Sequence, residues 1–258
     1  MILDKRADLG HGDVKKLLFS LSVPTITSQI VNMLYNLVDR VFIGHMQPAE
    51  TVGKLALTGV GVCLPIIMVI SAFASLMAIG GAPRASIAEG AGESEKSERI
   101  MGNCLTMLVI TALVLTVLFE SFAEPLLLMF GASENTIGYA LDYMRIYALG
   151  TIFVQLTLGM NAYITAQGFA TVSMKTVLIG ALLNTALDPL FIFGFGWGIR
   201  GAAIATVLAQ ILALVWQFRI FSDRNELLHF RRGIYRLKGK IVRNVLAIGM
   251  SPFLINLA

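Results

Sequence analysis

The chain has 258 residues, of which 56% are hydrophobic and only 14% are charged, and its formal net charge is +4. Soluble domains are about half apolar and about a quarter charged, so this composition excludes an ordinary soluble protein. The basic residues lie beside the apolar runs, which an anionic membrane surface explains better than a nucleic acid does. We therefore expect a lipid bilayer around the chain and no nucleic-acid partner.

Apolar runs of about 20 residues, each long enough to cross the hydrocarbon core, predict six membrane-spanning helices and the start of a seventh near residue 241. The N-terminus lacks the cationic segment, apolar core and cleavage site of a secretory signal, so we expect the first helix to be retained. The predicted helices cover residues 17–44, 54–80, 98–122, 136–166, 173–194 and 201–221.

The distribution of Lys and Arg predicts the orientation, because positive residues are retained on the cytoplasmic side of a membrane. With the N-terminus inside, sixteen of the 20 Lys and Arg residues fall on cytoplasmic stretches. The opposite side has only Arg40, Lys54, Arg145 and Arg200. We therefore predict a multi-pass protein of the cell membrane with a cytoplasmic N-terminus.

A short internal repeat relates the first predicted helix to the seventh. Residues 14–18 precede Pro24 at the same spacing at which residues 242–246 precede Pro252. Six helices lie between the copies, so both would start on the same side of the membrane, as in transporters with parallel repeats. The alternative is that two helices share a basic start and a proline by chance. If the repeat is real, the chain ends in the first helix of a second half and is a fragment.

These features predict an all-α membrane protein in four segments. The segments are a cytoplasmic N-terminal segment (1–16), a six-helix amino-terminal lobe (17–221), a basic cytoplasmic loop between lobes (222–240) and the start of a second, truncated lobe (241–258).

Two aspartates, Asp39 and Asp188, lie within predicted spans, where an ionised carboxylate costs at least about 2.5 to 3.5 kcal/mol. Asp39 continues a polar stripe along one face of its helix, and that face must look into protein or water rather than lipid. The alternative is an interfacial charge, because Arg40 follows Asp39. The rest of the stripe consists of Thr25, Ser28, Gln29, Asn32 and Asn36.

Asp188 follows Asn184 by one helical turn, so the carboxylate and the carboxamide share a face. The alternative is a polar pair that only holds helices together. Thr206 and Gln210 likewise share a face of the sixth predicted helix. Carboxylate, carboxamide and hydroxyl oxygens suit a small monovalent cation or a proton. Because burial disfavours a charged carboxylate, its neutralisation could switch the protein between two helix packings, as in a secondary antiporter.

Three of these segments resemble one protein family. Pro24 followed by residues 34–44 looks like the first helix of multidrug and toxic compound extrusion (MATE) transporters, in particular of their bacterial multidrug branch. Residues 184–194 are similar to the fifth helix of that family, and residues 201–206 to its sixth. The resemblance covers the chain from about residue 14 to its end.

The resemblance implies a twelve-helix transporter of two six-helix lobes, of which this chain is the amino-terminal lobe plus part of the seventh helix. It implies export of organic cations, drugs and dyes by antiport against Na⁺ or H⁺, with no other cofactor. The missing carboxy-terminal lobe or a second copy would be the partner. By position, the cation or sodium site would be Asp39, Asn184, Asp188 and Thr206; the hydrogen-bond network or substrate cavity would include Tyr143, Asn161, Asn36 and Gln29; and Pro24 would mark the bend of the first helix.

Other functions fit the sequence less well. A flippase for lipid-linked saccharides shares this architecture, but it would be favoured by cationic residues deep in the helices to hold a pyrophosphate, and almost none are present. In a membrane subunit without transport activity, the pair of Asn184 and Asp188 would have no role. An enzyme is not expected, because no nucleophile with a nearby base and no metal-spaced His or Cys cluster is visible.

Overall fold

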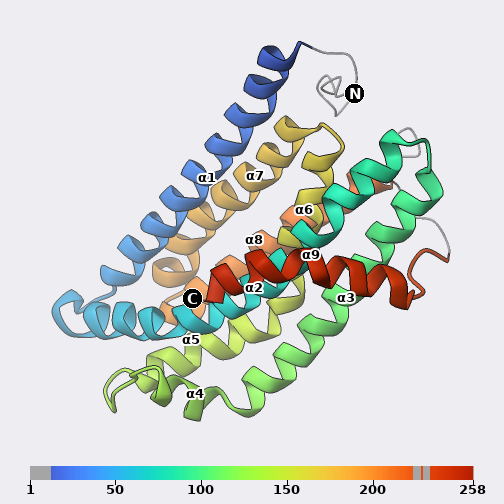
Figure 1. The fold of residues 1–258 in the computed structure, drawn as a ribbon. Helices are drawn as coiled ribbons and strands as arrows, with labels where there is room; N and C mark the ends of the chain where they lie inside the picture. Colours follow the sequence, from blue (N-terminus) through green and yellow to red (C-terminus); the bar gives the residue numbers. More distant parts are fainter. Residues whose placement is uncertain (1–12, 223–227, 229–232, 258) are drawn as a thin grey trace.

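The computed structural model describes residues 13–222, 228 and 233–257. Over these residues the chain is a bundle of helices without a β-strand (Figure 1). The elements are α1 (Val14–Gly44), the π-helical turn η1 (Ala49–Gly53), α2 (Lys54–Gly90), α3 (Ser94–Ser121), α4 (Ala123–Met129), α5 (Ile137–Leu149), α6 (Thr151–Ala166), α7 (Ala170–Pro189), the π-helical turn η2 (Leu190–Gly194), α8 (Gly198–Phe221) and α9 (Gly239–Leu257).

Among the described helices, five are long and apolar enough to cross a membrane, and the bent pair α5–α6 makes a sixth if it counts as one span. The six predicted spans are thereby confirmed, although the span predicted over 136–166 is broken by a bend of 57°. Gly150 lies at this break, and a Cβ there would lie 2.3 Å from Cγ2 of Val207. Glycine therefore lets α8 approach the bend closely.

Several helix ends differ from the prediction. The stretch from residue 82, with its Gly and Glu/Lys content, was expected to follow the end of the second helix, but α2 continues through Pro83 to Gly90. Tertiary packing explains the difference, because a Cβ on Gly81 would lie 2.1 Å from the Tyr163 hydroxyl and 2.5 Å from Sγ of Cys104. Beyond Gly81, the Ser86 hydroxyl donates to the carbonyl of Ala166 at 2.7 Å and Ala85 is fully buried, so tertiary contacts hold this stretch helical where its local sequence favours a break. The short helix α4 also lies in a stretch that was expected to be a loop.

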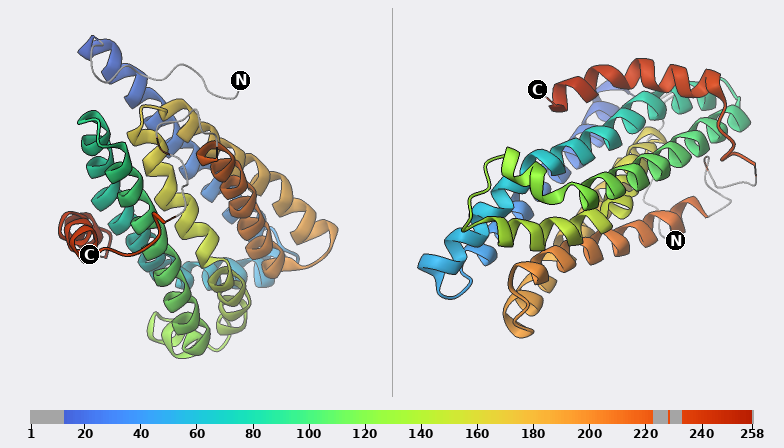
Figure 2. Two further views of the ribbon diagram at one scale, coloured as in Figure 1. Left: turned by 90° about the vertical axis from the view of Figure 1, so that its right-hand side faces the viewer. Right: turned by 90° about the horizontal axis from the view of Figure 1, so that it is seen from below.

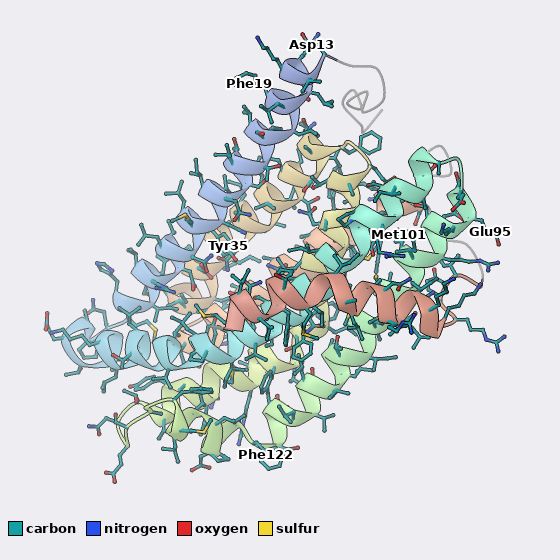
Figure 3. The ribbon with its side chains drawn as sticks, viewed as in Figure 1. Asp13, Phe19, Tyr35, Glu95, Met101 and Phe122 are labelled. Carbon is teal, nitrogen blue, oxygen red and sulfur yellow. The ribbon has the colours of Figure 1, made fainter. Side chains whose placement is uncertain are left out.

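The helices form a bundle in which α2 contacts α3, α5, α6 and α9, while α1 packs mainly against α7 along one side (Figures 1 and 2). Buried apolar side chains form two clusters, one around Met160 and Tyr163 and the other around Tyr143 and Met144. Much of α1 is exposed, and Phe19 lies on its outer side (Figure 3). The contact between α1 and α7 therefore decides which face of α1 turns inward.

The segment between α8 and α9 contacts α3 over its described residues. The Asn103 side chain donates hydrogen bonds to the carbonyls of Ile234 and Arg236, both at 3.2 Å, and accepts one from the Lys238 N–H at 2.7 Å. Residues 233–238 of the predicted loop are thus attached to the bundle. Residues 223–227 and 229–232 of that loop, and residues 1–12 of the predicted N-terminal segment, lie outside the described residues.

Two glycines bring the main chains of α2 and α9 into contact. A Cβ on Gly80 would lie 2.2 Å from the carbonyl oxygen of Val245, and a Cβ on Gly249 would lie 2.0 Å from that of Leu76. Such close approach of small residues is typical of helix packing in membranes. The segment predicted to begin near residue 241 is therefore a helix that packs on the six-helix bundle.

Candidate functional site

Two buried carboxyl groups meet where α1 lies against α7. Asp39 is 8% exposed and Asp188 is fully buried. Their carboxyl groups lie within hydrogen-bonding reach of each other. Among the described residues, neither Oδ1 of Asp39 nor Oδ2 of Asp188 has a hydrogen-bond donor. Acceptor oxygens from two helices therefore face one another, which is an arrangement that a shared proton or a small cation satisfies.

Asn184 and Thr206 complete this acceptor-rich cluster. The Asn184 side chain donates to Oδ1 of Asp188 at 3.1 Å and to Oγ1 of Thr206 at 3.3 Å. The Thr206 hydroxyl donates in turn to the carbonyl of Ala202, one turn earlier in α8, at 3.1 Å. The structure thus brings together the four residues that were predicted for the cation site, from α1, α7 and α8.

Tyr143 adjoins the same cluster from α5. It is buried, it lies within hydrogen-bonding reach of Thr206, and its ring stacks on that of Tyr147 with centroids 5.9 Å apart. The structure thus places Tyr143 beside the four residues of the predicted cation site, and its role in a hydrogen-bond network stays a prediction.

The backbone near Asp188 departs from a regular helix. Pro189 ends α7, and the π-helical turn η2 follows. Proline has no N–H to donate and so interrupts the helical hydrogen-bond pattern. Single π-helical turns occur frequently at functional sites. The local sequence therefore places Asp188 at an irregular point of the span.

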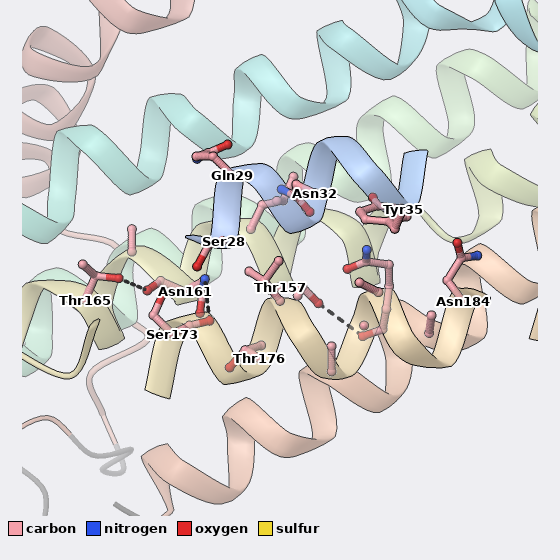
Figure 4. A pocket seen from close by; sticks show the side chains of 18 of the residues that line it. Ser28, Gln29, Asn32, Tyr35, Thr157, Asn161, Thr165, Ser173, Thr176 and Asn184 are labelled. Carbon is pink, nitrogen blue, oxygen red and sulfur yellow. Dashed lines mark hydrogen bonds between the residues drawn. The ribbon is translucent and has the colours of Figure 1, made fainter. Parts of the chain in front are cut away.

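A cavity of about 240 Å³ lies between α1, α6, α7 and α8. Asn184 lies at one end of it, and Asn161 and Ser173 lie at the other (Figure 4). The described residues that line it include no Asp, Glu, Lys or Arg. Its polar lining consists of Thr25, Ser28, Gln29, Asn32, Tyr35, Thr157, Asn161, Thr165, Ser173, Thr176, Asn184, Thr206 and Gln210.

The remaining predicted residues fall in different places. Gln29 lines the cavity, whereas Asn36 is exposed and donates to the carbonyl of Asn32 within α1 at 2.7 Å. Successive helix residues differ by about 100°, so Tyr35 rather than Asn36 faces the cavity. Pro24 is buried, and α1 continues past it as one helix.

Asn161 lies away from the aspartates and belongs to a second network. It contacts Gln217 of α8, a fully buried side chain that the sequence reasoning did not single out. The sequence does contain a signal for Gln217, because its amide lies inside an apolar span and a buried amide needs hydrogen-bond partners. Gln155 is also fully buried and links α6 to α2 and α3 through Ile70 and Thr111.

The donor set excludes some kinds of metal site among the described residues. These residues contain no group of three or more His, Cys, Asp or Glu side chains that could hold a metal ion. Two carboxylates with an amide and a hydroxyl oxygen are hard oxygen ligands, which fit Na⁺ better than a transition metal.

The model of the MatE family matches residues 24–190, which is well over half of the chain. The chain belongs to the MATE family. The multidrug export protein MepA of Staphylococcus haemolyticus is 27% identical to it over 244 residues, which cover 95% of this chain and 53% of MepA. The MepA protein of Staphylococcus aureus strain NCTC 8325 is 22% identical over an alignment of the same length. This MATE chain spans about half the length of the curated relatives it matches.

Solved transporter structures show the same fold. The outward-facing structure of a multidrug resistance MATE transporter of the MOP superfamily has a TM-score of 0.88 and 25% identity, with 99% of this chain and 55% of the transporter covered. A MOP superfamily transporter from Pyrococcus furiosus gives the same four values. The chain is therefore an all-α, multi-pass membrane protein with the architecture of one MATE lobe, and MATE proteins are transporters rather than enzymes.

Proposed function

We propose that this MATE chain forms the amino-terminal lobe of a secondary active multidrug exporter that exchanges Na⁺ or H⁺ for organic cations, drugs and dyes. The supporting observation is the pair of neighbouring, buried carboxyl groups, Asp39 and Asp188, each with one oxygen that has no hydrogen-bond donor among the described residues. When both are ionised, two such carboxylates carry two negative charges, whereas Arg40, the exposed neighbour of Asp39, supplies only one positive charge. The pair therefore takes up a proton, or a sodium ion that Asn184 and Thr206 also ligate.

The proposed coupling follows from the place of the ion site at the end of the cavity. Asn184 and Thr206 line the cavity and also contact the carboxylate cluster. Neutralising Asp39 and Asp188 changes the charge between α1 and α7, so the two packings of these helices differ in affinity for a cationic substrate. Such a difference in affinity is the requirement for exchange of ion against substrate. No cofactor besides the ion is needed.

The proposal extends to the organisation of the protein. The amino-terminal lobe is segment 17–221, and the second lobe begins with segment 241–258. The cytoplasmic parts are the N-terminus (1–16) and the basic loop 222–240. A carboxy-terminal lobe, or a second copy, completes the central cavity in the cell membrane. The flippase alternative has less support, because no Lys or Arg is among the described residues that line the cavity.

The test is dye efflux from drug-sensitive bacteria that express this lobe together with a carboxy-terminal lobe. Asp39→Asn and Asp188→Asn preserve side-chain shape but remove the ionisable group. We expect efflux to fall at least about tenfold in each, which corresponds to a loss of about 1.4 kcal/mol in coupling. Asp142→Asn is the matched control, because Asp142 pairs with Arg200 at 2.8 Å outside the cavity.

Efflux with and without sodium identifies the coupling ion. Normal efflux by Asp188→Asn, at a normal level of protein in the membrane, would refute the assigned site. If the parent protein exports no dye at all, the non-transporting alternative is favoured instead.

A further inference from the structure

The orientation of the Asn161 amide is determined by Gln217, which lies behind it and outside the cavity lining. Nε2 of Gln217 donates to the carbonyl of Thr157 at 3.0 Å and to Oδ1 of Asn161 at 3.3 Å. A main-chain carbonyl only accepts hydrogen bonds. The nitrogen of Gln217 must therefore face Thr157, and the atom of Asn161 that meets this nitrogen must be its oxygen.

A second carbonyl on the other side of Asn161 requires the same orientation. Nδ2 of Asn161 faces the carbonyl of Ser173 at 3.5 Å, the long limit of a hydrogen bond (Figure 4). The amide group has two N–H donors, and this long contact engages one of them at most. Asn161 therefore offers an N–H donor to its end of the cavity.

The opposite end of the cavity lies next to the carboxylates, because Asn184, which lines it, donates to Oδ1 of Asp188 at 3.1 Å. Both N–H groups of Asn184 are engaged, one by Asp188 and the other by Thr206. Oδ1 of Asn184 has no donor among the described residues, although the side chain is only 2% exposed. Asn184 follows Ser173 by eleven positions along α7, which is a rise of about 16 Å. One end of the cavity thus offers an N–H donor, and the other end lies against the carboxylate cluster.

We infer that the cavity selects ligands that combine a cationic group at the Asn184 end with a hydrogen-bond acceptor, such as a carbonyl oxygen, at the Asn161 end. Gln217 is the positioning residue for this selectivity, because it holds the oxygen of Asn161 away from the ligand. The inference rests on the proposed function, since it takes this cavity as the substrate site. A volume of about 240 Å³ lies below the usual range of about 300 to 1,000 Å³ and suits a small ligand.

Two probes that differ in one oxygen atom test the selectivity. (8-Oxononyl)trimethylammonium and nonyltrimethylammonium have the same chain length and the same cation, and only the first has a ketone. Their affinities are measured by calorimetry with the purified chain in lipid nanodiscs. We expect the unaltered chain to bind the ketone about three- to tenfold more tightly, as one net hydrogen bond provides.

Two substitutions should remove this preference while binding of the ketone-free probe persists. Asn161→Asp replaces the donor by an acceptor of nearly the same shape, and Gln217→Leu removes the group that orients Asn161. Both should bring the affinity ratio to about one. Adding Gln217→Leu to Asn161→Ala should leave the ratio unchanged, because Gln217 acts on the ligand only through Asn161.

Gln155→Leu is the matched control. Gln155 is as fully buried as Gln217 and also donates to a main-chain carbonyl, that of Ile70 at 3.3 Å, but it does not line the cavity or contact Asn161. Its substitution should lower stability and keep the ketone preference. If Gln217→Leu does not fold, Asn161→Asp decides the outcome.

Equal binding of the two probes by the unaltered chain, or a full ketone preference in Gln217→Leu, would overturn the inference. The binding assay uses no ion gradient, so its result is separate from the test of transport. A ketone preference without dye efflux would count against the proposed exporter alone, whereas dye efflux with equal probe binding would count against the selectivity alone.

Discussion

Replacing Asn103 by alanine should release residues 233–238 from α3. Asn103 is 1% exposed; its two N–H groups are shared among the carbonyls of Arg99, Ile234 and Arg236, and its Oδ1 accepts from the Lys238 N–H. Each hydrogen bond contributes about 0.5 to 1.5 kcal/mol net. Because one N–H group already serves Arg99, about two of these bonds attach the segment, and their loss in alanine should weaken the attachment by about 1 to 3 kcal/mol.

Hydrogen exchange of the Lys238 amide measures this effect directly, because that N–H donates to Oδ1 of Asn103. A loss of about 1 to 3 kcal/mol should speed its exchange about 5- to 150-fold. Thr106→Val removes one bond, the 2.9 Å contact with the Tyr235 carbonyl, and should have a smaller effect. Unchanged exchange at Lys238 in Asn103→Ala would refute the reasoning, since the attachment would then depend on other contacts.

Three further substitutions test the packing and the helix ends. Gly80→Val should separate α9 from α2 and lower the melting temperature in detergent, at a cost of about 1 to 3 kcal/mol from overpacking. Asp13→Ala removes the N-cap of α1 and should cost about 1 kcal/mol, seen as faster hydrogen exchange in the first turn of α1 only. Arg200→Gln breaks an exposed ion pair with Asp142 and should leave the melting temperature unchanged, so a clear drop there would contradict the low value expected of surface pairs.

The membrane-spanning helices could be predicted from the sequence because their signal is local. An apolar run of about 20 residues determines a span almost independently of its neighbours. The helix ends were predicted less well for the opposite reason. Gly81 and Pro83 favour a break locally, but the contact of Gly81 with Tyr163 and Cys104 is tertiary, and α2 runs on to Gly90.

The candidate site was predictable in part. Asp188 and Asn184 share a helix face whatever surrounds them. A carboxylate within an apolar span is a candidate functional group, because placing its charge there costs free energy. The meeting of Asp39 with Asp188 depends on how α1 packs against α7, which helical periodicity cannot supply. The place of Asn161 at the far end of the cavity is a tertiary feature of the same kind.

The sequence by itself determined that this is a helical membrane protein with costly polar groups in its spans, because hydrophobicity and helical periodicity act over short stretches of chain. Only the tertiary structure decided which polar groups meet, that α9 packs against α2, and which way each asparagine faces. Those outcomes depend on contacts between residues far apart in the chain, such as Gln217 with Asn161, where a partner's carbonyl determines which atom of an amide must face it.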